Sequence, residues 1–308
     1  MRKLTYIVPP DKDGICVGRF LRGHCQVSSR MVTKLKRVPN GITMDSVHIR
    51  TIDPVRAGGE IVLILPEDER PALSTDIPID VVFEDDDVII IDKQAGLPVH
   101  PTRGHFDDTL ANAYAAHLEK RGEKGTFRPI NRLDRDTTGL LLACKNAYSC
   151  SRLHGHFDKR YYAVCQGELE GSGTIDAPIR RCAEPGIKRE VGEGGQRAVT
   201  HWKAVYSRDG LTLLEIELGT GRTHQIRTHF SCCMNMPLIG DDMYGGSTDI
   251  IKTQALHCAV LGFTHPVTDE RVCFSSDKFS ALYILGDDFV SAYLAAVKEA
   301  EEIIKNKA

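Results

Sequence analysis

The stretch that decides the fold lies at residues 131–139 and reads NRLDRDTTG. Arg132 and Arg135 stand on either side of Asp134, and Gly139 then leads into the apolar run LLLACK. A short apolar run next to a glycine is typical of a buried strand. We therefore expect a charged loop that is held in place by a buried strand beginning at Leu140.

Asp134 is the first candidate for chemistry. An aspartate can attack an anomeric carbon as a nucleophile when its carboxylate is ionised. A neighbouring guanidinium group favours the ionised form of a carboxylate, and this loop supplies two arginines. From these residues alone, a charged surface loop that joins two strands is the alternative interpretation.

The composition describes a globular protein. The 308 residues are 42% hydrophobic and 26% charged, which suits one large domain or a large and a small one. No run approaches the roughly 20 apolar residues that cross a bilayer, and the N-terminal stretch lacks the apolar core of a signal peptide. We expect a cytoplasmic protein without membrane association, and a monomer because no coiled-coil pattern is evident.

The ten cysteines include no C-x-x-C pair, and most stand singly in apolar runs. Such cysteines are typical of reduced, buried thiols rather than of zinc ligands. We expect no metal site.

Charge is segregated along the chain. The net charge is −3, yet residues 14–44 contain no acidic residue and hold a cluster of basic ones, namely Arg19, Arg22, Arg30, Lys34, Lys36 and Arg37. A local basic patch is the electrostatic footprint of a nucleic-acid contact.

The same N-terminal region has its own folding pattern. Apolar spacing predicts two short amphipathic helices, the second capped by Ser28 or Ser29, followed by short strands around ITM, VHI and EIVLILP. Basic helices before a small sheet resemble the S4-type RNA-binding module, and a solvated helix pair in an accessory domain is the alternative. We expect an S4-like α/β domain at residues 1–65, a linker at 66–78 and a larger domain at 79–308.

The larger domain has the pattern of an α+β fold. The expected strands are two in IDVVFEDDDVIIIDK, one in LLLAC and four in RYYAVCQGEL, GTIDAPI, AVTHWKAVYS and LTLLEIEL. Helices are expected in DTLANAYAAHLEKRG, in NAYSCSRLHGHF and after Asp288, where apolar residues share one face. Strands in long succession with interspersed helices favour a mainly antiparallel mixed sheet over a doubly wound fold.

Two further segments hold candidate functional residues. In GTGRTHQIRTHF, residues 219–230, Thr223 can cap a helix that carries Arg227, and Arg222 adds positive charge where a helix N-terminus attracts anions. In KRYYAV, strand alternation sends Tyr161 and Tyr162 to opposite faces, so only one ring can line a cleft and stack on a base.

Motifs for nucleotide or metal chemistry are missing from the sequence. It contains no G-x-x-x-x-G-K-[ST] loop, no H-E-x-x-H helix and no G-x-S-x-G elbow. We therefore expect no cofactor, and any catalysis has to rest on side chains.

Taken in order, these segments closely resemble the motifs of the RluA family of RNA pseudouridine synthases. The matching segments are DKQAGLPVHP, NRLDRDTTGLLLACK, KRYYAV, GGQRAVTHW, GTGRTHQIRTHF with PLIGDDMYGG, and LHCAVLGFTHP. The resemblance spans roughly residues 76–286 and implies a pseudouridine synthase domain within residues 79–308. It also implies that the partner is RNA, ribosomal or transfer. The S4-like character of the N-terminal module favours large-subunit ribosomal RNA.

The resemblance also implies roles for individual residues. Asp134 corresponds to the catalytic aspartate, Arg227 to the arginine that pairs with it, and Tyr161 to the tyrosine that packs on the flipped base. Arg132 corresponds to the arginine that fills the gap left by the extruded base. Asn131 is a departure, because family members usually have histidine there.

Two other classes of protein remain open on the residues alone. One is a catalytically silent RNA chaperone or assembly factor on the same fold. The other is a hydrolase that uses Asp134 as a nucleophile, although no second carboxylate has a convincing acid role.

Overall fold

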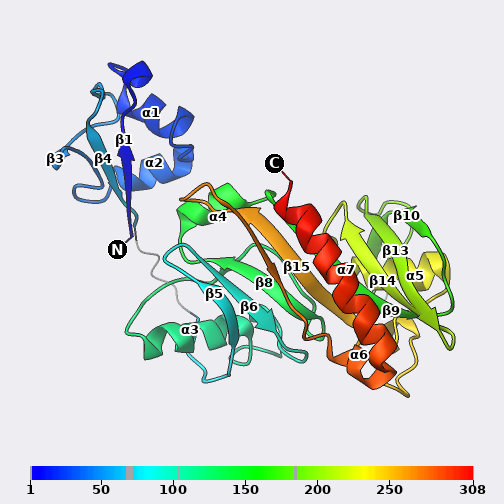
Figure 1. The fold of residues 1–308 in the computed structure, drawn as a ribbon. Helices are drawn as coiled ribbons and strands as arrows, with labels where there is room; N and C mark the ends of the chain where they lie inside the picture. Colours follow the sequence, from blue (N-terminus) through cyan, green and yellow to red (C-terminus); the bar gives the residue numbers. More distant parts are fainter. Residues whose placement is uncertain (1, 67–71, 103, 184–185, 308) are drawn as a thin grey trace.

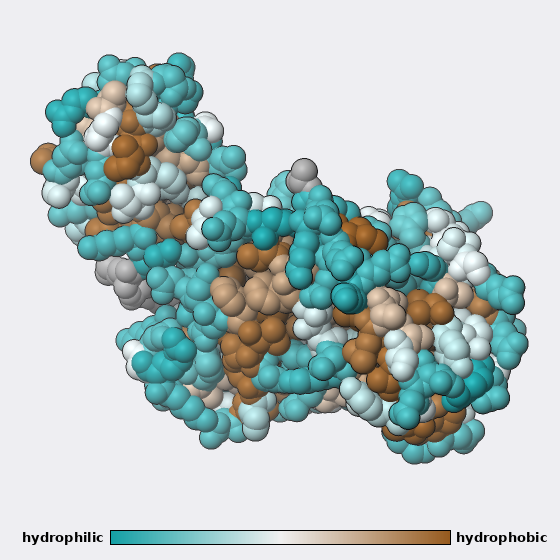
Figure 2. Space-filling model, viewed as in Figure 1, coloured by the Kyte–Doolittle hydropathy of each residue, from teal (hydrophilic) through white to brown (hydrophobic). Residues whose placement is uncertain are grey.

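A computed structural model describes residues 2–66, 72–102, 104–183 and 186–307. Figure 1 shows a small N-terminal lobe, here called the N-terminal module, beside a larger body built on one extended sheet. The same view in Figure 2 shows a mostly hydrophilic surface that hydrophobic patches interrupt on both the module and the body. Among the described residues, none of the helices has the length and apolar character needed to cross a membrane.

The N-terminal module is a small sheet covered by two helices. Its strands pair antiparallel in the order β1-β4-β2-β3. The elements are β1 Lys3–Ile7, the 3-10 turn η1 Pro10–Lys12, α1 Val17–Gly23, α2 Ser29–Leu35, β2 Ile42–Met44, β3 Val47–His48 and β4 Glu60–Ile64. The helices and later strands agree with the sequence pattern, whereas β1 was not expected.

Local sequence explains the helices of the module. The side chain of Ser28 accepts a hydrogen bond from the backbone N–H of Met31, so Ser28 is the N-cap of α2. Phe20 and Leu35 are fully buried between the helices and the sheet. Arginines on the other helix faces stay in solvent, which leaves the module with a positively charged helical surface.

The body is built on a mixed sheet that, within the described residues, has ten strands. Their order is β10-β13-β14-β9-β15-β8-β6-β5, with β16 paired to β15 and β7 to β8. All pairs are antiparallel except β15 with β8, which confirms the expected α+β class. The strands are β5 Asp80–Glu84, β6 Val88–Lys93, β7 Arg128–Pro129, β8 Thr138–Cys144, β9 Phe157–Gln166, β10 Ser172–Asp176, β13 Val199–Arg208, β14 Leu211–Leu218, β15 Leu256–Thr264 and β16 Arg271–Ser275.

Helices cover both faces of this sheet. On one face lie α3 Leu110–Lys120 and α5 Gln225–Met234, and on the other lie α4 Ala147–Leu153, α6 Ser280–Leu285 and α7 Asp287–Lys305. A separate hairpin pairs β11 Ile179–Arg181 with β12 Arg189–Val191 beside α5. The short η2 Asp242–Tyr244 follows α5.

Alternation along the central strands sends side chains to both cores. On β9, Tyr161 packs with α3 and α5, whereas Tyr162 packs with α6 and α7. This confirms that the two tyrosines face opposite sides. The apolar stripe of α7, from Phe289 through Tyr293 to Ile304, is buried as its spacing predicted.

The start of β8 depends on a glycine. Gly139 has φ +101° and pairs in parallel with Cys258 of β15. A Cβ atom built there would lie 2.3 Å from the carbonyl oxygen of Cys258, so only glycine allows this approach of the two strands. The glycine that ends the stretch 131–139 therefore sets the position of the loop before it.

Several polar contacts join the module to the body, and two of them involve Arg2 and Tyr6. Arg2 Nη2 donates to Asp87 Oδ2 at 2.6 Å, and the hydroxyl groups of Tyr6 and Tyr148 lie 2.9 Å apart. Asp87 is 1% exposed and also accepts from Asn146 Nδ2. The buried carboxylate thus ties the N-terminal strand to the turn between β5 and β6.

Asp85, Asp87 and His265 form a group whose geometry could hold a cation. Asp85 Oδ1 accepts from the backbone N–H groups of Asp87 and Val88, and Asp85 Oδ2 lies 2.8 Å from His265 Nε2. Asp87 accepts from Arg2. These side chains therefore have hydrogen-bond partners that account for their positions.

One helix boundary differs from the sequence pattern, and part of the expected linker lies outside the described residues. Helix α4 ends at Leu153, earlier than NAYSCSRLHGHF suggested, because Gly155 adopts φ +81° and β9 begins at Phe157. In the expected linker, residues 67–71 lie outside the described residues. Asn112 of α3 donates to the carbonyl of Leu73, so the end of that segment packs on the body.

Candidate active site

The loop that carries Asp134 is anchored from within. Asn131 is 2% exposed, donates from Nδ2 to the carbonyl of Leu140 and accepts at Oδ1 from the N–H of Leu142. The amide therefore closes the loop against β8. Because the side chain is buried in this way, the departure from histidine at position 131 places no exposed group at the surface.

A buried lysine holds the same loop from the other side. Lys93, at the end of β6, donates from Nζ to the carbonyl oxygens of Gln94, Leu97 and Arg135. The side chain is 1% exposed, and burial lowers the pKa of Lys93 to about 7. The hydrogen bond to the carbonyl of Arg135 fixes the peptide between Arg135 and Asp136, one residue beyond Asp134.

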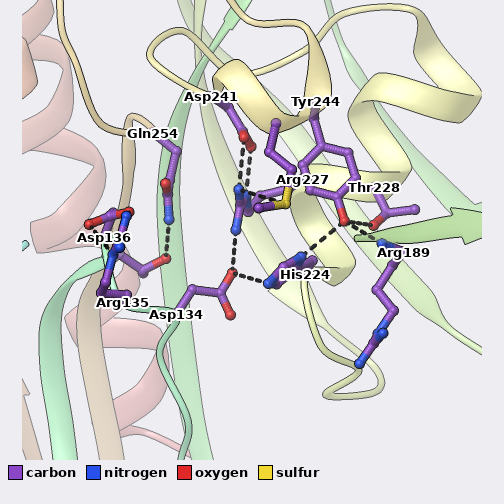
Figure 3. A network of polar contacts seen from close by, with 12 residues as sticks. Asp134, Arg135, Asp136, Arg189, His224, Arg227, Thr228, Asp241, Tyr244 and Gln254 are labelled. Atoms are coloured by element: carbon purple, nitrogen blue, oxygen red, sulfur yellow. Dashed lines mark hydrogen bonds and ion pairs between the residues drawn. The ribbon is translucent and has the colours of Figure 1, made fainter. Parts of the chain in front are cut away.

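Arg227 of α5 lies between two carboxylates (Figure 3). Its Nε and Nη2 donate to Asp241 at 2.6 and 2.8 Å, and its Nη1 donates to Asp134 Oδ2 at 3.1 Å. The side chain of Asp241 is fully buried, whereas that of Asp134 is 24% exposed. Burial alone would lower the pKa of Arg227, but the hydrogen bonds and charge of Asp241 raise it, so the guanidinium stays charged.

The residue that begins α5 is not the one the sequence suggested. We expected Thr223 to cap this helix, but the N-cap is His224, in the left-handed region at φ 54° and ψ 23°. The N-cap side chain makes no capping hydrogen bond. The turn before the helix is held instead by Gln225, whose Oε1 accepts from the N–H of Arg222 and from the hydroxyl of Thr220. The tight turn leaves His224 aimed at Asp134, with Nε2 3.9 Å from Asp134 Oδ2.

Tyr161 contributes an aromatic ring to the same place. It is 4% exposed, and burial raises the pKa of its hydroxyl well above the ordinary value, so the phenol is neutral. Lys159 Nζ lies 5.5 Å from the ring centroid. The ring faces the pocket because β9 alternation turns Tyr162 to the opposite core.

A single pocket brings together five of the residues selected from the sequence. It is lined by Asp134, Arg132, Tyr161, Arg222 and Arg227, which come from three separate segments. Because the loop, β9 and the start of α5 converge here, residues far apart in the sequence become neighbours.

The other selected residues lie elsewhere. Arg19 and Arg30 are exposed on the helices of the N-terminal module, Arg37 is exposed in the turn after α2, and Lys34 of α2 is half-buried. None of these four lines the pocket at Asp134.

Three residues of the site were missed. Asp241 and Tyr244 lie in the segment PLIGDDMYGG, which was quoted only as a motif, and His224 was given no role. Two adjacent aspartates in an otherwise apolar stretch were the available signal for Asp241. No local pattern pointed to the contact of Tyr244 with His224, because it depends on the turn before η2.

A larger cavity of about 230 Å³ lies behind the loop, lined by Lys93, Thr138, Asp92 and Lys278 among others. Asp92 accepts a hydrogen bond from Ser276, and burial raises the pKa of its carboxyl group. Asp134 is not among the lining residues. The candidate active site is therefore the pocket at Asp134, where a carboxylate faces an open space.

The arrangement suits a reaction at a carbon atom that a carboxylate can reach. Arg227 holds Oδ2 of Asp134, and among the described residues no donor is bonded to Oδ1. One oxygen is thus fixed by a guanidinium and the other is free to act as a nucleophile or base. Aromatic and basic side chains around it fit a substrate with a flat ring and phosphate groups.

Comparison with known proteins agrees with this class of site. A family model described as RNA pseudouridylate synthase matches residues 87–232. Ribosomal large subunit pseudouridine synthase D of Pseudomonas aeruginosa is 35% identical over 76% of this chain and 79% of its own length. The protein of the same name in Vibrio parahaemolyticus is 34% identical over 92% and 86%, and the uncharacterized RNA pseudouridine synthase YjbO of Bacillus subtilis is 35% identical over 82% and 92%.

Solved structures support the same fold. The human RNA pseudouridylate synthase domain containing 1 matches with a TM-score of 0.53 and 22% identity, covering 66% of this chain and 84% of that one. The fold and the sequence together define an isomerase that converts uridine in RNA to pseudouridine. The chain belongs to the RluA family of RNA pseudouridine synthases.

Proposed function

We propose that Asp134 is the catalytic carboxylate of this enzyme and that Oδ1 is its reacting oxygen. The observation that carries this assignment is the hydrogen bond of 3.1 Å from Arg227 Nη1 to Oδ2, in a pocket that Tyr161 also lines. The bond holds the carboxylate in one orientation and leaves Oδ1 towards the open space. The uracil base leaves the ribose, turns, and is rejoined through C5.

Arg132 and Tyr161 are assigned to the flipped nucleotide. A base must leave its stack before a carboxylate inside a pocket can reach the sugar, and this costs a few kcal/mol. The exposed guanidinium of Arg132 is placed to fill the gap in the stack, and the ring of Tyr161 packs on the base. Arg222, exposed at the same pocket, takes a backbone phosphate.

The RNA substrate is assigned to large-subunit ribosomal RNA. Support comes from relatives named for that molecule, which align with most of this chain. We further propose a division into an S4-like module at residues 1–65, a linker at 66–78 and the synthase domain at 79–308. Basic residues of the module, Arg19, Arg30, Lys34 and Arg37, then contact RNA, and the enzyme works as a cytoplasmic monomer.

The experiment uses RNA labelled with tritium at uracil C5, because isomerisation releases that hydrogen. Asp134→Asn keeps the size of the side chain and should abolish release, while Asp136→Asn in the same loop should stay within several-fold of the native rate. Asp136 pairs with Arg135 and does not line the pocket, which makes it a matched control. Substantial release by Asp134→Asn would exclude Asp134 as the reacting group.

The substrate is tested separately. Pseudouridines are mapped by chemical probing of total RNA from cells with and without this protein. Loss of sites from the large ribosomal RNA supports the assignment, whereas loss confined to transfer RNA contradicts it.

A further inference from the structure

His224 occupies a strained position that points it into the pocket. It is a non-glycine residue with φ 54°, a conformation that costs free energy and is found at functional sites. The residue is 8% exposed and lines the pocket together with Asp134. The backbone geometry, rather than chance packing, brings its ring beside the reacting carboxylate.

The hydrogen bonds of Tyr244 define which nitrogen of His224 carries the proton (Figure 3). The hydroxyl of Tyr244 accepts from the backbone N–H of Arg189 at 2.8 Å and from the hydroxyl of Thr228 at 3.3 Å. Its own proton is then left for His224 Nδ1, at 3.0 Å. A neutral imidazole that accepts at Nδ1 carries its hydrogen on Nε2.

The imidazole of His224 is neutral at neutral pH. Burial lowers its pKa, the positive charges of Arg227 and Arg189 lower it further, and the charges of Asp134 and Asp241 only partly oppose this. A neutral ring with the hydrogen on Nε2 is a donor and cannot act as a base at that atom.

The Nε2–H group has no hydrogen-bond acceptor among the residues that the structure describes. Asp134 Oδ2 is 3.9 Å away, beyond hydrogen-bond distance, and already accepts from Arg227. Nε2 is not one of the fully buried side-chain atoms that lack a partner, so it is accessible from the pocket and its hydrogen is available to a bound ligand.

We propose that His224 is a further catalytic residue, which donates a hydrogen bond from Nε2 to a carbonyl oxygen of the uracil ring while that ring is detached from the ribose. The inference rests on the proposed role of Asp134. When the bond between C1′ and N1 breaks, its electron pair stays with uracil and the negative charge spreads to the carbonyl oxygens. His224 stabilises this charge and neither gains nor loses a proton.

Two substitutions separate this role from a structural one. Asn adopts the left-handed backbone conformation readily. Its short amide extends about as far as Nδ1, towards Tyr244, and does not reach the pocket. His224→Asn therefore keeps the backbone conformation and loses the donor at Nε2. Gln tolerates the backbone less well, but its amide N–H extends about as far as Nε2. A structural role predicts that Asn is the better replacement, and the proposed role predicts Gln.

The measurement is the single-turnover rate of tritium release, together with RNA affinity and the thermal midpoint of each variant. We expect His224→Asn to lower the rate about 10²- to 10³-fold, the usual effect of removing a donor to a developing oxyanion, with RNA affinity unchanged. His224→Gln should retain the rate within about tenfold. An Asn variant at full rate, or one at least as fast as the Gln variant, overturns the proposal.

Tyr244→Phe adds a second test, because it frees Nδ1 and lets the proton move there. The rate should fall in the native background and change little in the His224→Gln background, where no tautomer exists. Equal losses in both backgrounds contradict the role of Tyr244 in orienting the donor. If Asp134→Asn is inactive and His224→Asn is fully active, only the present inference fails, whereas an active Asp134→Asn overturns the assignment of Asp134 itself.

Discussion

Arg227 is bound to Asp241 through two nitrogen atoms and reaches Asp134 with the third. The two bonds to Asp241, at 2.6 and 2.8 Å, fix the plane of the guanidinium, so the bond of 3.1 Å to Asp134 has only one geometry. The buried carboxylate of Asp241 thus orients the guanidinium of Arg227, which in turn orients Asp134. Asp241 is the residue just before η2, so the position of Asp134 depends on this turn as well.

The first prediction concerns Arg227→Lys. A lysine keeps the charge but cannot bind Asp241 through two atoms and also reach Asp134, so one carboxylate is left without its donor. We expect a decrease of about 2–3 kcal/mol in unfolding free energy, somewhat less than the cost of removing a buried partner altogether. Tritium release should fall at least about tenfold, since the carboxylate is no longer held.

Arg222→Lys is the matched control for this prediction. Arg222 is an exposed arginine at the same pocket, and its guanidinium donates to the carbonyl of Arg197. Urea unfolding of both variants should show a change only for Arg227→Lys. Native stability and rate in Arg227→Lys would mean that the planar fork is not required.

The second prediction is that Gly139→Ala destabilises the fold. A Cβ atom at this position meets the backbone of Cys258 at 2.3 Å, and φ is +101°. The atoms in the way are backbone atoms, which cannot move aside as a flexible side chain could. We therefore expect the free energy of unfolding, measured in urea, to fall by about 2–4 kcal/mol.

Gly155→Ala separates the clash from the backbone strain. Gly155 also has a positive φ, +81°, but nothing lies within 4 Å of a Cβ built there. This variant should lose only about 1 kcal/mol. Equal losses at the two glycines would contradict the close approach of β8 and β15.

The third prediction is a pH dependence of stability at His257. The ring is fully buried, with Nδ1 2.7 Å from the hydroxyl of Thr138 and Nε2 3.2 Å from that of Ser276, and burial lowers its pKa to about 3. Between the folded pKa and the ordinary pKa of about 6.5, the unfolded chain binds a proton that the folded one does not. Stability therefore falls as the pH drops below about 6.5.

The size of this effect follows from linkage. From about pH 7 to about pH 5, His257 alone should remove about 2 kcal/mol of unfolding free energy. His257→Gln removes the titrating group, and the difference between native and variant slopes isolates its contribution from that of other histidines. Parallel slopes over this range would show that His257 does not titrate in this way.

The fourth prediction tests the basic surface of the N-terminal module. Replacing Arg19, Arg30, Lys34 and Arg37 together by glutamine should weaken RNA binding. The slope of log K against log salt should become shallower by about 0.7–0.9 for each phosphate that the module no longer neutralises. Affinity is measured at several salt concentrations with the native RNA.

Lys298→Gln on α7 serves as a control, since this exposed lysine lies on the opposite face of the sheet from α5. It should leave the salt slope unchanged. A slope that is equally unaffected by the four substitutions in the module would refute the module as an RNA-binding surface.

Much of the fold was predictable because it depends on neighbours along the chain. The cap at Ser28, the opposite faces of Tyr161 and Tyr162, and the stripe on α7 all follow from local spacing. The strand β1 was missed, because its pairing with β4 joins segments far apart in the sequence. The expected cap of α5 was wrong, because the side chain of Gln225 binds the turn before it.

The sequence by itself determined the type of fold, the family and the candidate carboxylate, since strand alternation, helix periodicity and the order of motifs are written in adjacent residues. Only the tertiary structure decided that Asp241 orients Arg227, that Asn131 and Lys93 clamp the loop, and that His224 faces Asp134 with an unused donor. The physical reason is distance along the chain. Arg227 contacts Asp241, 14 positions away, and Asp134, 93 positions away, and the hydrogen-bond geometry between them is a property of packing, which no local pattern records.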